Sequence, residues 1–115
     1  MPRTEVTVLY LLAFVMLKHA RPQSAATLLE ALDLLEPGQA RTLMALATAQ
    51  VRCGRARQAL ATLDRCRRAG GDTAPIELLR SQAFGILHRH AEAAAALRIF
   101  LQQRIPPATG ASTGT

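Results

Sequence analysis

Hydrophobic residues recur at helical spacing along this chain, and the pattern is clearest between residues 40 and 73. Each half of that stretch carries its own apolar face, with the sequence Arg52-Cys53-Gly54-Arg55 between the two halves. The apolar positions are Leu43, Leu46 and Ala47 in the first half and Ala59, Leu60, Leu63 and Cys66 in the second. Apolar residues three and four apart fall on one face of an α-helix. The stretch is therefore predicted to form two amphipathic helices joined by a tight turn, with Gly70 and Gly71 at its end.

The same pattern occurs on both sides of this stretch, one repeat period away in each direction. The positions in register are Ala25, Ala59 and Ala93; Leu29, Leu63 and Leu97; Ala13, Ala47 and Ser81; and Leu32, Cys66 and Phe100. A period of about 34 residues with small side chains on both helices resembles the tetratricopeptide repeat, or TPR. The chain is therefore predicted to be all-α, with three tandem TPR-like helix pairs that form a short right-handed superhelix with a concave groove.

One helical domain is predicted over residues 1–105, with repeats at about 6–39, 40–73 and 74–105. The six helices are expected at 5–19, 23–35, 40–53, 56–68, 74–87 and 91–104. In the last helix, Leu97, Phe100 and Leu101 are expected on the inner face. Glu77 stands where the repeat usually has a large apolar residue, so the third unit is degenerate, as terminal repeats often are. Residues 106–115 have too few apolar side chains to offset ordering and are predicted to be a disordered tail.

The N-terminal residues 6–17 form a nearly unbroken apolar run that allows two interpretations. The run is too short to span a bilayer, which takes about 20 residues, but its length suits the core of a signal peptide. Against a signal peptide, Leu9, Leu12 and Ala13 fall in register with the repeat at 40–73. We therefore predict a first helix with more apolar surface than its neighbours cover, so that part of it faces a partner. A secreted protein, with residues 1–20 as a signal segment, is the alternative.

Charge and candidate chemistry change this picture little. The formal net charge is +6, but the basic residues are spread along the chain, so no nucleic-acid partner is predicted. Cys53 and Cys66 lack the paired spacing of a zinc site, and Cys66 falls at a buried packing position. His19, His88 and His90 fall at or near helix ends. No combination of nucleophile, base and carboxylate emerges, so we expect no enzyme, no cofactor, no metal and no small-molecule substrate.

The candidate functional surface is the concave face, which the first helix of each pair lines in stacked helical repeats. The candidate partner-binding residues on this face are Tyr10, Phe14, Leu17, Met44, Val51, Leu78 and Ile86, with Thr48 and Gln82 between them. Aromatic and methionine side chains suit the anchoring of a partner. The candidate rim charges are Arg41, Arg52 and Arg55, which would pair with acidic residues beside a bound amphipathic helix. The alternatives are that the apolar positions pack on one another and that the arginines are only solvated.

From about Leu9 to Arg104 the sequence resembles the small, three-repeat TPR chaperones of bacterial type III secretion, in particular the chaperone of a small early export substrate. The strongest matches are Ala25-Ala26-Thr27-Leu28-Leu29-Glu30-Ala31-Leu32 followed by Pro37, and the last helix pair from Leu78 through Ala93 to Phe100-Leu101.

The resemblance implies a cytoplasmic chaperone, peripheral at the inner-membrane export apparatus, that holds a secretion substrate in its groove as a heterodimer. It would keep this client soluble and ready for export. In a related version the client is the needle subunit, and a second chaperone or the export gate is a further partner. The alternative from another class is a generic TPR scaffold for protein–protein interaction.

Overall fold

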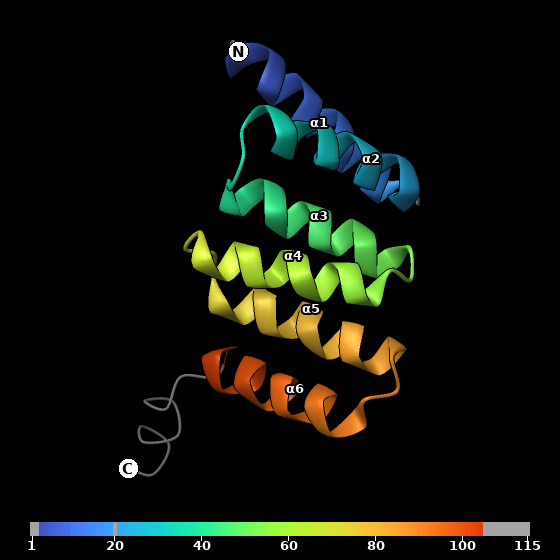
Figure 1. Ribbon diagram of the computed structural model, residues 1–115, viewed down its shortest axis with the longest axis vertical. Coiled ribbons are helices and arrows are strands. Elements are labelled where there is room, and N and C mark those ends of the chain that lie inside the picture. The colour runs from blue at the N-terminus through green and yellow to red at the C-terminus, as the bar shows by residue number, and fades with distance from the viewer. Residues whose placement is uncertain (1–2, 20, 105–115) are drawn as a thin grey trace, which may run out of the picture.

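The residues that the structure describes form six helices (Figure 1). The structure, a computed structural model, describes residues 3–19 and 21–104. The helices are α1 (Arg3–Lys18), α2 (Pro22–Leu35), α3 (Ala40–Arg52), α4 (Ala56–Arg68), α5 (Thr73–Ile86) and α6 (His90–Arg104). The described residues contain no strand, so the all-α prediction is confirmed. The tail predicted at 106–115 lies outside the described residues.

The turns between helices follow from residues that suit a left-handed backbone. Gly38, Gly54 and Gly70 have φ angles of 75°, 77° and 87°, a region that glycine enters without steric cost. His88 has a φ angle of 60°, and it stands one repeat period after Gly54, in the turn between the two helices of the third pair. The turns inside the second and third pairs therefore share a left-handed residue at the same repeat position, although His88 is not glycine.

The helices stack in chain order along the long axis, with α1 at one end and α6 at the other (Figure 1). The principal extents are 53 × 32 × 27 Å, and the radius of gyration is 15.8 Å, against about 13 Å for a compact globule of this length. Each helix packs mainly on its neighbours in the chain, while α1 and α5 each also touch α3. This is the arrangement of tandem TPR-like helix pairs.

Two adjoining clusters of buried side chains form the core. One cluster joins α1, α2 and α3 around Leu29 and Leu32, and the other joins α3, α4 and α5 around Leu43 and Leu63. Cys66 is fully buried in the second cluster, as predicted. The fully buried small residues that let the helices approach closely are Ala13, Ala25, Ala47 and Ala59. The repeat register therefore marks the core correctly in the first two pairs.

The last helix departs from the prediction. Leu97 and Leu101 were expected on the inner face of α6, but they are 42% and 45% exposed, and only Phe100 is half-buried. The equivalent residues Leu29 and Leu63 are fully buried, because each of them lies between two further helices. In the described part of the chain no helix follows α6, so its far side has nothing to pack against.

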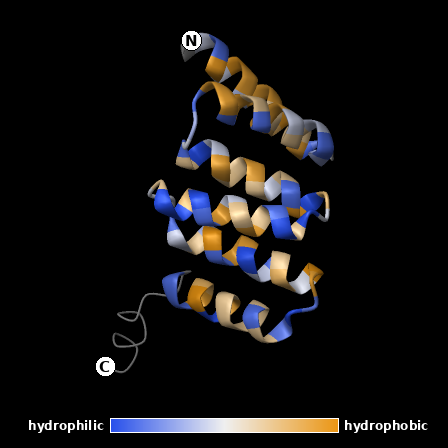
Figure 2. Ribbon diagram, in the orientation of Figure 1, coloured by the Kyte–Doolittle hydropathy of each residue, from blue (hydrophilic) through white to orange (hydrophobic). Residues whose placement is uncertain are grey.

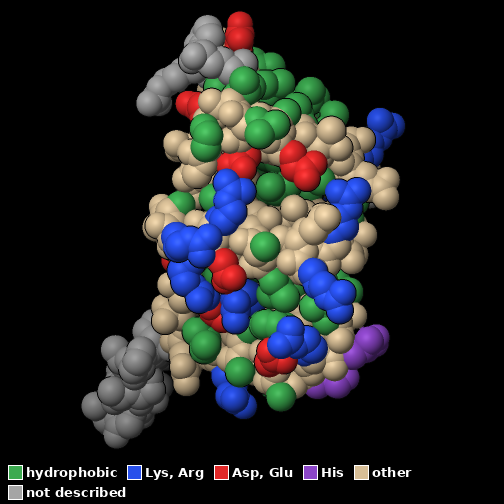
Figure 3. Space-filling model, viewed as in Figure 1, with side chains coloured by type: hydrophobic (Ala, Val, Ile, Leu, Met, Phe, Trp, Pro, Cys, Tyr) green, Lys and Arg blue, Asp and Glu red, His purple; other side chains and the backbone are tan. Residues whose placement is uncertain are grey.

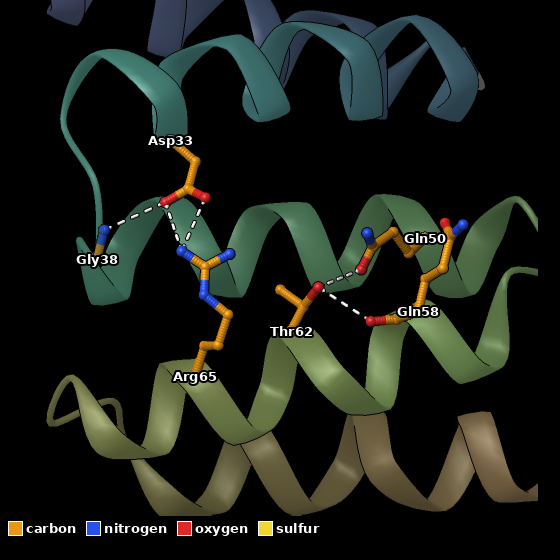
Figure 4. A network of polar contacts seen from close by, with 6 residues as sticks. All are labelled: Asp33, Gly38, Gln50, Gln58, Thr62 and Arg65. Carbon is orange, nitrogen blue, oxygen red and sulfur yellow. Dashed lines mark hydrogen bonds and ion pairs between the residues drawn. The ribbon is translucent and has the colours of Figure 1, made fainter.

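Polar contacts tie the pairs together across the apolar core (Figure 4). Asp33 of α2 pairs with the Arg65 guanidinium of α4 at 2.8 Å, and the same carboxylate accepts the Gly38 N–H at 3.2 Å. Inside the second pair, the buried Thr62 hydroxyl donates to Gln50 Oε1 at 2.7 Å. Hydrogen bonds thereby satisfy the Asp33 carboxylate and the Thr62 hydroxyl, which avoids the desolvation cost of leaving these two groups unpaired.

Glu77 is a buried carboxylate rather than a surface charge. Its side chain is 5% exposed, and it pairs with Arg67 of α4 and, at 3.4 Å, with Arg80 Nε one turn later on α5. Arg80 also lies 3.7 Å from Asp64 of α4. The position that looked degenerate in sequence is therefore an ion-pair cluster that joins the second and third pairs.

Candidate functional site

A groove of about 580 Å³ opens between α1, α3 and the beginning of α5. Its apolar lining from α1 and α3 includes Tyr10, Phe14, Leu17, Met44 and Ala45. The turn after α4 and Pro75 of α5 close one side of it. The first helix of each pair thus contributes to the same hollow, and its volume falls in the range of about 300–1,000 Å³ that is usual for binding pockets.

An aromatic pair from α1 forms one wall. Tyr10 and Phe14 are four residues apart, so they lie on the same face of the helix, and their rings stack with centroids 5.2 Å apart. Tyr10 is 6% exposed, whereas Phe14 is 40% exposed. Tyr10 therefore acts as a rigid support, while the Phe14 ring remains free to contact a ligand.

A second part of the lining comes from α3, where Met44 and Thr48 line the groove one turn apart. Both are half-buried, and the Thr48 hydroxyl donates to the Met44 carbonyl at 2.9 Å. That hydroxyl is thereby satisfied within the helix. Met44 presents a flexible, polarisable side chain that adapts to different partner shapes.

Tyr10 is the most perturbed group in the groove. Burial raises the pKa of Tyr10 above its ordinary value, and the nearby Arg41 charge opposes this effect only in part. The Arg41 guanidinium carbon lies 4.4 Å from the Tyr10 ring centroid, a cation–π geometry. Among the described residues, no group accepts or donates a hydrogen bond at the Tyr10 hydroxyl within bonding geometry. The Tyr10 side chain is therefore neutral at physiological pH and holds Arg41 beside the groove.

The charges that line the groove are mainly positive. Lys18, Arg41 and Arg52 contribute cations, and Asp72 contributes one carboxylate. Arg52 Nη1 donates to the Leu17 carbonyl at 2.9 Å, which ties the end of α1 to α3. A cationic rim around an apolar floor favours a partner that carries acidic residues beside its apolar ones.

The structure brings together only part of the predicted site. The candidate residues that line this groove are Tyr10, Phe14, Leu17, Met44 and Thr48, and the candidate charges Arg41 and Arg52 line it as well. Val51 is half-buried against the second core cluster, and Leu78 is half-buried on α5. Ile86 is exposed near the end of α5, and Arg55 precedes α4. These last four residues do not line the groove.

Sequence reasoning missed the groove residues that come from the turn after α4. In sequence, Gly70, Gly71, Asp72 and Pro75 are signals that end one helix and start the next, yet all four line the groove. No local signal indicates this second role, because the path of a turn in space does not follow from the helical register. Lys18 also lines the groove, from the last turn of α1.

Within 3–19 and 21–104, no three His, Cys, Asp or Glu side chains gather in a way that would hold a metal ion. None of the described helices combines the length and the apolar character that crossing a bilayer requires.

Comparison with known proteins adds the family. Residues 16–83, more than half of the chain, match the tetratricopeptide repeat family. A comparison with curated proteins finds no match. The matched segment runs from the end of α1 into α5 and contains most of the groove lining. Repeats of this kind form protein-interaction surfaces on stacked helix pairs. The repeat period, the six stacked helices and this match agree, and the chain belongs to the tetratricopeptide repeat family.

Proposed function

We propose that this protein is a chaperone that binds a type III secretion export substrate through the groove between α1, α3 and α5. Membership of the tetratricopeptide repeat family supports a protein partner in general. The choice of a secretion client rests on the resemblance of residues 25–32, Pro37 and the last helix pair to small chaperones of that system.

The observation that carries the proposal is the composition of the groove. The apolar lining includes Phe14 and Met44, and the buried Tyr10 ring stacks on Phe14. Lys18, Arg41 and Arg52 add positive charge to the same groove. An amphipathic helix laid into such a groove would bury its apolar face on Phe14 and Met44. Its flanking acidic residues would meet Arg41 and Lys18. A client helix that is sequestered in this way cannot self-assemble, which is what a chaperone of an export substrate must achieve.

The remaining parts of the proposal concern place and partners. We place the complex in the cytoplasm, peripheral at the inner-membrane export apparatus, as a heterodimer with its client. A second chaperone or the export gate would contact the surface that the client leaves free.

Co-expression with the small early export substrate, or with the needle subunit, of the same genome tests the proposal. The wild-type chain should keep this client soluble and co-purify with it. Phe14→Glu and Met44→Glu should each weaken binding at least about thirtyfold, because a carboxylate would be desolvated in an apolar site. Ile86→Glu is the matched control, since Ile86 is exposed to the same degree as Phe14 but lies outside the groove. Helical circular dichroism of each variant verifies the fold.

Two outcomes would count against the proposal in different ways. If neither export substrate co-purifies with the wild-type chain, the secretion role is wrong and a generic TPR scaffold, which recruits another protein, becomes the better interpretation. If a client binds and Phe14→Glu or Met44→Glu leaves the affinity unchanged, the groove is not the binding site.

A further inference from the structure

The two ends of the helical stack expose apolar residues, and the middle does not. Among the described residues, the large apolar side chains that are exposed come from α1, α2, α5 and α6, and none comes from α3 or α4. Figure 2 shows apolar residues along much of α1, and Figure 3 shows apolar side chains gathered at the α1 end of the molecule. Patches of this kind on a folded domain mark interaction surfaces.

The exposed side of α1 corresponds to a buried interface elsewhere in the chain. The exposed residues Val8, Leu11, Leu12 and Val15 stand one repeat period before Thr42, Ala45, Leu46 and Ala49 of α3. All four α3 residues are buried, and three of them belong to the core cluster that includes α2. The same positions in α5 include Ile76, Leu79 and Ala83, which are also buried. Thus α1 presents the surface with which α3 and α5 meet the preceding helix pair.

The exposed side of α6 is the other half of the same interface. Leu97 is 42% exposed, whereas its counterparts Leu29 of α2 and Leu63 of α4 are fully buried where a further pair follows. Leu101 is the counterpart of Arg67, which pairs with Glu77 across the contact between α4 and α5. Hence α6 presents the surface with which α2 and α4 meet the following pair.

The two surfaces also fit each other at the position of the buried ion pair. In the repeat register, Leu9 of α1 is the counterpart of Glu77, just as Leu101 of α6 is the counterpart of Arg67. The contact between α4 and α5 has the ion pair of Arg67 and Glu77 at this position. A contact between α6 and α1 would have Leu101 and Leu9 there instead. A hollow of about 320 Å³, lined by Thr4, Glu5, Val8 and Leu9, lies at this place on α1. Leu9 and Leu101 stand at matching positions on the two halves, so burial of these two side chains against each other leaves neither position with an unpaired charge.

From this match we propose that a second copy of the chain docks its α6 on α1, so that the stack of helix pairs continues from one molecule to the next. The contact would be heterologous, because each molecule uses a different surface at its two ends. Copies joined in this way extend the superhelix and do not close on themselves. The residues after Arg104 include one large apolar side chain, Ile105, so the sequence there supplies little apolar surface to cover α6. The proposal concerns the ends of the stack and does not depend on a client in the groove.

Sedimentation velocity on the full chain without a client tests the proposal. The average mass of the wild-type chain should rise with concentration and pass that of a dimer. Leu11→Glu spoils only the α1 surface and Leu97→Glu spoils only the α6 surface, so each variant alone should be a monomer. An equimolar mixture of the two retains one intact pair of surfaces and should form a dimer with one copy of each variant. Leu101→Glu is a second substitution on the α6 surface, for use if circular dichroism shows that Leu97→Glu affects folding.

Leu34→Glu is the matched control, because Leu34 is 82% exposed on α2 and belongs to neither end surface. This variant should oligomerise as the wild-type chain does. A wild-type chain that stays monomeric at every concentration would overturn the proposal, and so would a mixture of the two variants that stays monomeric. Sensitivity to Leu11→Glu alone would point instead to a symmetric dimer through α1. Variants that oligomerise as fully as the wild-type chain would show that neither surface is used.

Discussion

The buried carboxylate of Glu77 gives the most specific stability prediction. Glu77→Gln keeps the size of the side chain and removes its charge. Taking one partner from a fully buried ion pair costs about 3–5 kcal/mol, but here the partners reach water, since Arg67 is 48% and Arg80 is 25% exposed. The loss should therefore approach that of one charge-assisted hydrogen bond, at about 2 kcal/mol. This corresponds to a fall of about 10 °C in Tm for a domain of this size.

Urea unfolding followed by far-UV circular dichroism measures this change. Glu92→Gln is the control, because Glu92 pairs with Arg89 on the surface, where both side chains are about half exposed. An exposed pair of this kind contributes less than about 1 kcal/mol. Equal stability of Glu77→Gln and Glu92→Gln would refute the reasoning that burial makes this ion pair important.

Three further predictions concern the turns and the core. Gly71→Ala should lower the free energy of unfolding by about 2 kcal/mol, because a Cβ there would lie 2.4 Å from Cys66 Sγ and 2.9 Å from the Cys66 carbonyl oxygen. Gly85→Ala places a Cβ with nothing within 4 Å and should raise the free energy of unfolding by about 0.5–1 kcal/mol. If urea unfolding gave similar free energies for the two variants, the steric reasoning would be wrong. His88→Gly should stabilise the fold by about 1 kcal/mol, because the φ angle of 60° suits glycine; an unchanged or lower Tm would speak against it. Burial raises the pKa of the Cys66 thiol above its ordinary 9.0. Below pH 9 the Cys66 thiol is protonated in both the folded and the unfolded chain. Above pH 9 the thiol of the unfolded chain ionises before that of the folded chain. Stability should therefore fall at alkaline pH by at most about 1.4 kcal/mol per pH unit, and Cys66→Ala should weaken this fall when unfolding is compared across pH.

Most of the fold could be predicted from the sequence, because the same spacing of apolar residues recurs in each helix pair. The positions of Leu29 and Leu63 in the repeat register identify them as core, and both are fully buried. Helix ends were closely predictable, since Gly38, Gly54 and Gly70 mark three of the turns. Amphipathic spacing and turn glycines are local properties, so they can be read without knowledge of the tertiary structure.

The register could not predict what lies beyond the end of a repeat array. Leu97 has the same place in its helix as Leu63, but it is exposed because no further helix of the described chain packs on it. For Glu77 the register indicated a misplaced charge. Its burial depends on Arg67 and Arg80, which approach it from α4 and from one turn along α5. Such partners depend on the tertiary structure rather than on the local pattern.

The sequence indicated the part of the candidate groove that comes from α1 and α3, but not the part that comes from the turn after α4 and from α5. Tyr10, Phe14 and Met44 line one groove, as the concave register indicated, because α1 and α3 are in contact and both contribute to it. On α5 only Pro75 reaches the groove, so Leu78 and Ile86 lie outside it. The turn after α4 closes that side. The repeat register predicts the same role for equivalent residues on the concave face of every pair. The position of the groove, however, also depends on the path of the turn after α4.

In the proposed complex a client helix lies against Met44. Selective ¹³C labelling of the methionine methyl groups tests it directly, because Met44 lines the groove while Met16 packs against the core cluster of α1, α2 and α3. On titration with the export substrate, we expect the Met44 methyl resonance to shift and the Met16 resonance to stay in place. A substrate that binds while the Met44 resonance does not move would contradict the claim.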